Sequence, residues 1–176
     1  MKNSTTEVRK RRSPLKRPFV RALLGIVAIL VMIAVPVFEP WTLWINKTIN
    51  EPAPGDAAPP TELARGDLIS HEHAATGTVR VLQLADGSRV LRLENLDTTS
   101  GPDLKVLLSD AEVKSGRAGW HVFDDGEHLN LGELKGNKGD QNYRLPRNAD
   151  LGDYRSVSVW CDRFNVSFGA ATLAGG

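Results

Sequence analysis

Apolar and polar residues alternate with a period of two along much of the chain after residue 50. Residues 78–84 and 88–94 each show this alternation, and Asp86-Gly87 lies between them. Because Asp and Gly tolerate the positive φ angles of tight hairpin turns, the pattern predicts a β-hairpin here. Further strands are predicted at shorter alternating stretches, residues 103–109, 129–134 and 142–145.

Helical spacing of apolar residues over more than two turns does not occur after residue 50. Short strands with turn residues about every eight to twelve positions are typical of antiparallel sandwiches and barrels. The pattern therefore predicts an all-β domain, an antiparallel β-sandwich or barrel, over residues 66–176.

The stretch SVSVWCDRFNVSF, residues 156–168, contains the only cysteine of the chain, Cys161. Its apolar residues change parity in the middle, which a hairpin with a two-residue connection at Asp162-Arg163 explains. A bulge within one continuous strand would change the parity as well. The hairpin places apolar pairs on one face, namely Cys161 with Phe164, Val159 with Val166, and Val157 with Phe168. The opposite face then holds Ser156, Ser158, Trp160, Asn165 and Ser167.

Residues 22–38 form an uncharged apolar stretch that follows a block of Lys and Arg. A helix of this length covers roughly 25 Å at about 1.5 Å per residue, close to the thickness of a bilayer's hydrocarbon core. Trp41, Leu43, Trp44 and Ile45 extend the stretch toward the far interface, where Trp is favoured. The sequence therefore predicts a cytoplasmic segment (1–21) and a single-pass plasma-membrane anchor (22–45). A cleaved secretory signal shares these features and is the alternative.

Residues 51–60 contain four prolines, so we expect an extended Pro/Ala-rich linker over residues 46–65 and an extracytoplasmic domain after it. Residues 1–50 carry nine Lys or Arg against two Asp or Glu, whereas the remainder carries thirteen against nineteen. A phosphate-binding surface needs clustered cations, so this distribution argues against nucleic acid as a partner of the domain.

A single cysteine in an exported domain cannot form an internal disulfide. The remaining roles for Cys161 are a buried apolar side chain, an intermolecular bridge, a reactive thiol or a metal ligand. The parity of the strand places Cys161 on the apolar face, where free cysteine commonly lies.

Four histidines could contribute to a metal site: His71, His73, His121 and His128. In a strand, His71 and His73 would point to one face, which is compatible with shared coordination. Both methionines, Met1 and Met32, precede the domain, so a blue-copper centre would lack its usual axial ligand. Zinc bound by histidines and Cys161 stays open, but surface or turn histidines are the simpler interpretation, and we predict no metal.

Other reaction types lack their sequence motifs. The chain has no C-x-x-C-H motif for haem attachment and too few thiols for an iron–sulfur cluster. A G-x-S-x-G turn, an H-E-x-x-H helix and a phosphate-binding glycine loop are also absent from the sequence. Enzymatic activity therefore has no nucleophile and base to support it, and no cofactor is identified.

Two segments resemble the opening and closing motifs of a known family. They are GDLISHEHAATGTV at residues 66–79 and VSVWCDRFNVSFGAATL at residues 157–173, with weaker matching motifs in the same order between them. They resemble the electron-transfer DM-thirteen domain family, a small extracellular all-β module. The resemblance implies a redox role centred on Cys161 and an electron-transfer partner outside this chain.

Two hypotheses follow for the function. In the first, the protein is a membrane-anchored extracytoplasmic redox or electron-transfer module that acts through Cys161, with Trp160 and His73 close to it. In the second, it is a non-catalytic cell-surface binding or structural domain, and Cys161 is a core residue. A redox or cell-surface protein is the partner that we expect in either case.

Overall fold

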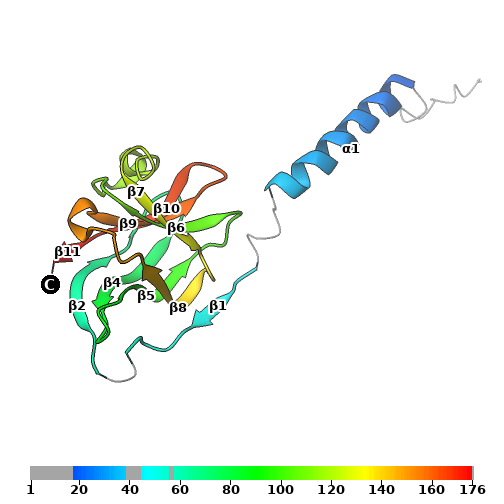
Figure 1. Ribbon diagram of the computed structural model, residues 1–176. Helices are drawn as coiled ribbons and strands as arrows, with labels where there is room; N and C mark the ends of the chain where they lie inside the picture. Colours follow the sequence, from blue (N-terminus) through cyan, green and yellow to red (C-terminus); the bar gives the residue numbers. More distant parts are fainter. Residues whose placement is uncertain (1–17, 39–44, 56–57, 176) are drawn as a thin grey trace, which may run out of the picture. The chain divides into compact units, whose positions relative to one another are not determined.

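The computed structural model describes residues 18–38, 45–55 and 58–175 of the chain. The chain divides into two compact units, residues 1–40 and residues 41–176, and each is described by itself. The first unit contains the helix α1 (Pro18–Phe38), and the second contains all the described strands (Figure 1).

Helix α1 is 21 residues long, and nearly all of its side chains are exposed. Pro18 suits the first helical position because the N–H that it lacks has no partner there. By length and composition the span Pro18–Pro36 could cross a membrane, and a signal sequence would meet the same criterion. The helix begins before the predicted anchor, and the predicted extension through Trp41 and Trp44 lies outside the described residues.

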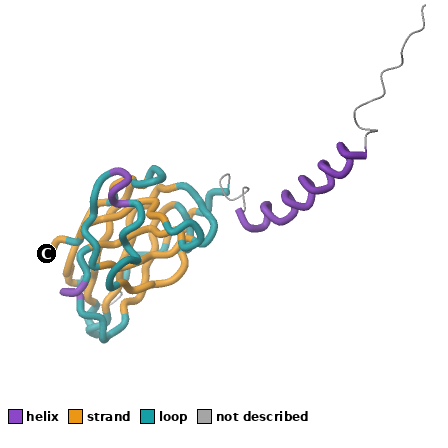
Figure 2. Tube along the Cα trace, turned by 90° about the horizontal axis from the view of Figure 1, so that it is seen from above, coloured by secondary structure: helices purple, strands orange, loops and turns teal. Residues whose placement is uncertain are grey.

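The second unit consists of two sheets, and Figure 2 shows strands making up most of it. The first sheet has the order β1 (Thr48–Asn50), β8 (Lys138–Leu145), β5 (Arg89–Thr98), β4 (Ala75–Gln83), β2 (Thr61–Asp67) and β11 (Ala174–Gly175). The second sheet has the order β3 (Ile69–Ser70), β10 (Val166–Thr172), β9 (Ser156–Cys161), β6 (Leu104–Ser109) and β7 (His128–Glu133). Among the described strands only β1 and β8 pair in parallel. The predicted all-β sandwich is confirmed.

The main core lies between the two sheets. Alternate residues of the central strands supply it, and each of these is fully buried: Val79, Val81, Leu91, Leu93, Val106, Leu108, Val157 and Val159. A smaller cluster of Leu107, Phe123, Trp160 and Ala170 lies against the other face of the second sheet. Strands β6 and β9 are therefore buried on both faces, and the second face includes the buried serines Ser109, Ser156 and Ser158.

The predicted hairpin at Asp86-Gly87 is confirmed as the connection between β4 and β5. The Asp86 carboxylate accepts hydrogen bonds from the Ser88 backbone and hydroxyl, and Gly87 has a φ of +76°. The three further strands predicted from alternation correspond to β6, β7 and β8. Strand β8 begins earlier than predicted, at Lys138, because backbone pairing continues through polar residues that carry no apolar alternation.

The segment predicted as a linker, residues 46–65, differs from the structure because it contributes β1 and most of β2 to the first sheet. Strand β2 pairs with β4 from Thr61 to Asp67, so the domain begins well before residue 66. Its side chains are mostly polar, and Glu62 forms an ion pair with Arg80 of β4 instead of entering the core. Alternation in the sequence therefore gives no signal of this strand.

The predicted hairpin between β9 and β10 forms, but its connection is four residues long, not two. Cys161 pairs with Val166, and Asn165 in the turn has a φ of +53°. Phe164 lies in the turn and is 43% exposed, so its predicted place in the core is wrong. A bulge between Ser167 and Gly169 then pairs Val159 with Gly169 in place of Val166.

Candidate redox site around Cys161

Cys161 is the last residue of β9, and its side chain is fully buried in the main core. Its thiol donates a hydrogen bond to the carbonyl oxygen of Pro102, with 3.1 Å between Sγ and O. Pro102 lies in the turn before β6, whose first residue, Leu104, pairs with Cys161. The position of the sulfur is thus set by two adjacent strands and the turn that leads into one of them.

The turn before β6 covers the sulfur through close backbone contacts. Asp103 has a φ of +60°, and its carbonyl accepts a hydrogen bond from the Asp162 N–H at 3.1 Å. Gly101 lies against the ring of Phe168, where a Cβ atom would be only 2.7 Å from Cζ. Glycine at this position therefore lets the turn approach the core closely.

Burial raises the pKa of the Cys161 thiol, and the Asp103 carboxylate adds to this effect. Backbone hydrogen bonds from Phe164 and Arg163 oppose the shift because they favour the thiolate. The raised pKa keeps the sulfur protonated at neutral pH, in agreement with its hydrogen bond to Pro102.

Trp160 lies on the opposite side of β9 from Cys161. Its indole packs in the smaller cluster, edge-on to Phe123 with 6.4 Å between ring centroids, whereas the sulfur faces the main core. Adjacent residues of a strand point to opposite faces, so the alternation in the sequence predicts Trp160 on the face opposite Cys161. Any electronic coupling between the Trp160 indole and the Cys161 sulfur would pass through the β9 backbone.

His73 contacts the core cluster that contains Cys161. Its ring packs on Phe168 with 4.0 Å between centroids, and Phe168 belongs to the core cluster that contains Cys161. The His73 side chain is 28% exposed, and its Nε2 lies 2.6 Å from a carboxylate oxygen of Glu72. The ring of Phe168 thus lies between the partly exposed His73 imidazole and the core that surrounds the Cys161 sulfur.

The structure separates His71 from His73, which were expected to share a face. Strand β3 ends at Ser70, so the two histidines lie in a bend where alternation no longer applies. His71 is buried and packs against Phe123, and a 2.8 Å hydrogen bond joins its Nδ1 and the Ser167 hydroxyl. Among the described residues, no group of three His, Cys, Asp or Glu side chains is placed to hold a metal ion.

Sequence reasoning missed the buried hydrogen-bond chain that ends at His71. The Ser158 hydroxyl donates to Ser167 at 2.9 Å, and Ser167 bonds to His71. Burial lowers the pKa of His71, while the Lys114 backbone opposes this shift. The alternation placed Ser158 and Ser167 on one face, but the bend that brings His71 to them has no signal in the sequence.

The two sheets and the buried Cys161 define the class of this domain, which is an all-β sandwich with one thiol enclosed in its core. The sequence model of the family described as Electron transfer DM13 matches residues 67–173, which is more than half of the chain. The chain therefore belongs to the DM13 electron-transfer family, and the resemblance seen in its motifs is confirmed. No curated protein and no solved structure matches the chain.

Proposed function

We propose that this protein is a membrane-anchored, extracytoplasmic electron-transfer module in which Cys161 is the redox-active group. The observation that carries the proposal is the family match over residues 67–173, which includes Cys161 and the strands that surround it. The proposed electron donor and acceptor lie outside this chain.

The proposed anchorage rests on α1 and the residues before it. The helix has no charged residue between Arg21 and Phe38, and a basic block precedes it in the sequence. An excess of Lys and Arg marks the cytoplasmic side of a single-pass helix, so the domain after it would be extracytoplasmic. Alkaline carbonate extraction tests the anchorage, and protease treatment of intact cells tests the orientation.

The chemistry available to Cys161 is restricted by its isolation. With one cysteine in the chain, oxidation cannot end in an internal disulfide. One-electron oxidation of the thiol would send an electron to an oxidised redox protein and release the thiol proton to solvent or to that partner. The Phe164 and Arg163 backbone groups that favour the thiolate assist loss of the proton.

A second function, as a non-catalytic binding or structural domain, is favoured by one specific observation. The Cys161 side chain is 0% exposed and belongs to the same cluster as Val157 and Val159. Free cysteine is among the residues most often buried for packing alone. The two functions differ in whether a redox partner can exchange electrons with this sulfur in the folded protein.

One experiment on the full chain in detergent separates these functions. Wild type and Cys161→Ala are titrated coulometrically with a one-electron mediator, and the Cys161 alkylation rate is measured before and after unfolding. Electron transfer through the sulfur predicts that the wild type gives up one more electron per chain than the alanine variant. Equal titrations, with a thiol that alkylates only after unfolding, would leave the structural function.

A further inference from the structure

Residues 46–54, called the N-terminal strap below, connect α1 to the sandwich and lie outside the family match. They include β1, which forms the outer edge of the first sheet by parallel pairing with β8. The pairing is short, from Thr48 opposite Lys138 to Asn50 opposite Asp140. Side-chain contacts on both sides of β1 add to it.

Asn137 holds the first residues of the strap. Its amide is 3% exposed and donates to the Asn46 side chain at 2.8 Å, while its oxygen accepts the Lys47 N–H at 2.8 Å. The same amide nitrogen donates to the Thr98 carbonyl at 2.7 Å. One buried side chain thus joins the strap to the end of β5.

Two glycines provide the space into which the strap fits. A Cβ atom on Gly136 would be 2.4 Å from the Lys47 carbonyl oxygen, and one on Gly139 would be 2.1 Å from that of Ile49. Real Cβ atoms do not approach backbone oxygens so closely, so any larger residue at these positions would displace the strap. The surface of β8 is therefore shaped to receive this backbone.

Arg92 holds the end of the strap from strand β5. Its guanidinium, in a side chain that is 5% exposed, donates to the carbonyls of Glu51 and Pro52 at 3.2 and 3.1 Å. The rest of the guanidinium is bound by Glu94 and Asp140 at 2.9 and 2.7 Å. These carboxylates fix the planar group in the orientation that reaches both carbonyls.

Glu51 adds a charged contact at the same end. Its carboxylate accepts hydrogen bonds from Lys135 Nζ at 2.6 Å and from the Asn142 N–H at 2.7 Å. Polar contacts therefore fasten the strap along its length.

Apolar burial contributes little to this attachment. None of the strap's side chains is fully buried, and Ile49 is the only one in β1 that is even partly covered. Segments with few buried apolar contacts open at a lower free energy than the core to which they attach. By contrast, β2 pairs with β4 from Thr61 to Asp67 and packs Leu63 and Ala64 against the main core.

We propose that the N-terminal strap is a conformational device that opens while the sandwich stays folded, so that the tether between α1 and the domain has two lengths. The effect on the domain's reach rests on the proposed membrane anchorage. With the strap closed, eight peptide units join Phe38 to Asn46, a span of at most about 28 Å. With it open, the chain is free as far as Thr61, and the limit rises to about 80 Å.

Trypsin reports strap opening at a defined bond. Residues 22–46 contain no Lys or Arg, so Lys47 is the first cleavage site after α1, and Arg65 is the next. Lys47 is paired in the closed strap, and Arg65 is paired in β2. Cleavage tracks the open population when opening and closing are fast, so the two sites separate strap opening from unfolding of the sheet.

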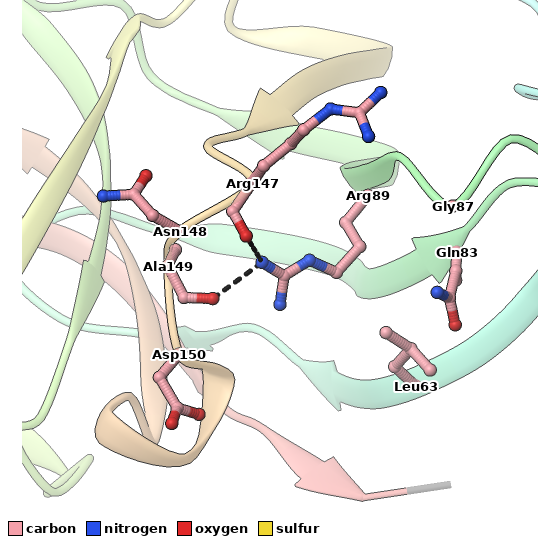
Figure 3. Close-up of a pocket in the computed structure, with 8 residues that line it drawn as sticks. All are labelled: Leu63, Gln83, Gly87, Arg89, Arg147, Asn148, Ala149 and Asp150. Carbon is pink, nitrogen blue, oxygen red and sulfur yellow. Dashed lines mark hydrogen bonds between the residues drawn. The ribbon is translucent and has the colours of Figure 1, made fainter.

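The main test compares Arg92→Lys with Arg89→Lys in the full chain reconstituted in vesicles. Arg89, on the same strand, donates to the backbone carbonyls of Pro146, Arg147 and Ala149 at 3.2, 3.1 and 2.6 Å, and Figure 3 shows the last two of these bonds. These bonds hold the loop after β8 and not the strap. Lysine keeps the charge in both variants but loses the planar fork. Arg92→Lys should speed cleavage at Lys47 by about tenfold, because the paired hydrogen bonds to the Glu51 and Pro52 carbonyls need the planar fork. Cleavage at Arg65 should stay unchanged, because the lysine charge can still pair with Glu94 or Asp140 within the sheet.

Arg89→Lys should leave cleavage at Lys47 unchanged and affect only the loop that it holds. A second variant, Gly136→Ala, adds no polar change and should also speed cleavage at Lys47 by forcing the strap outward. It serves as the test if Arg92→Lys fails to fold.

Equal acceleration of cleavage at Lys47 and Arg65 in both strap variants would show that the strap opens only when the sandwich unfolds, and this would overturn the proposal. The absence of any acceleration at either site would overturn it as well. Failure of the proposed function gives a different result. Loss of redox activity leaves the cleavage pattern intact, and an unanchored chain would leave the vesicle fraction before trypsin is added.

Discussion

The Cys161 site and the N-terminal strap are held by different forces. Apolar side chains from both sheets surround Cys161, and one hydrogen bond fixes its thiol. The strap is held by an arginine, a lysine and two amides, and all of its side chains stay at least partly exposed. Burial of the sulfur is reversed only when the core opens, whereas the partly exposed ion pair between Glu51 and Lys135 weakens with salt and low pH. The domain thus combines a rigid centre with an edge that can be released.

The largest expected effect comes from cutting the chain to the residues that match the family, 67–173. This fragment lacks β1, β11 and nearly all of β2, so Val79 and Val81 of β4 lose the strand that borders them. We expect it to lose cooperative thermal unfolding in circular dichroism, while residues 45–176 keep it. A sharp transition at the same temperature in both would show that the outer strands are dispensable.

Phe168→Ala should be the most damaging single substitution near the sulfur. The ring is 2% exposed and packs against Gly101 and His73. Removing a buried Phe costs about 3–5 kcal/mol, measurable by urea unfolding. Phe164→Ala is the matched control, because that ring is 43% exposed and should cost less than about 1 kcal/mol. Similar losses in both would contradict the assignment of Phe168 to the core.

Acidification should release the strap before it affects the core. Burial alone would raise the pKa of Glu51, but Lys135, the Asn142 N–H and Arg92 together lower it below its ordinary value of 4.5. A lowered pKa contributes stability that is present above pH 4.5 and is lost as pH falls below it. Hydrogen exchange, corrected for its intrinsic pH dependence, should show protection of residues 46–54 falling there while protection of β9 persists.

Glu51→Gln removes the titrating group and provides the control for this experiment. The variant should show reduced strap protection at neutral pH and little further change on acidification. Equal pH dependence in wild type and variant would show that another group controls the strap.

The smallest expected effect concerns the thiol itself. Because burial raises the pKa of Cys161, the folded state favours the neutral form, and this stability is present below pH 9. It should be lost as pH rises through the higher pKa of the folded state. Cys161→Ala should remove this part of the decline in unfolding free energy above pH 9. The check is a urea titration at each pH, and identical slopes would contradict the burial of the sulfur.

Sequence reasoning predicted the features that depend on apolar alternation. It identified the β4–β5 hairpin, the strands β6 to β8 and the inward orientation of Val157, Val159 and Cys161. The motif around Cys161 also identified the family before any comparison.

Features that depend on polar and backbone contacts were not predictable in this way. The N-terminal strap is fixed by Arg92, Asn137 and two glycines whose roles become visible only when distant segments meet. The turn length after Cys161 depends on the left-handed conformation of Asn165, which the apolar pattern does not record. The burial of His71 likewise depends on a bend and not on strand alternation.

The parallel pairing of β1 with β8 also sets an order of events during synthesis. The partners Lys47 and Asn137 are 90 residues apart in the chain. At about 5–20 residues per second, translation supplies the second about 5–18 seconds after the first. Every newly made molecule therefore passes through a period in which its N-terminal strap has no strand to join. The extended tether therefore precedes the closed strap in the life of every molecule.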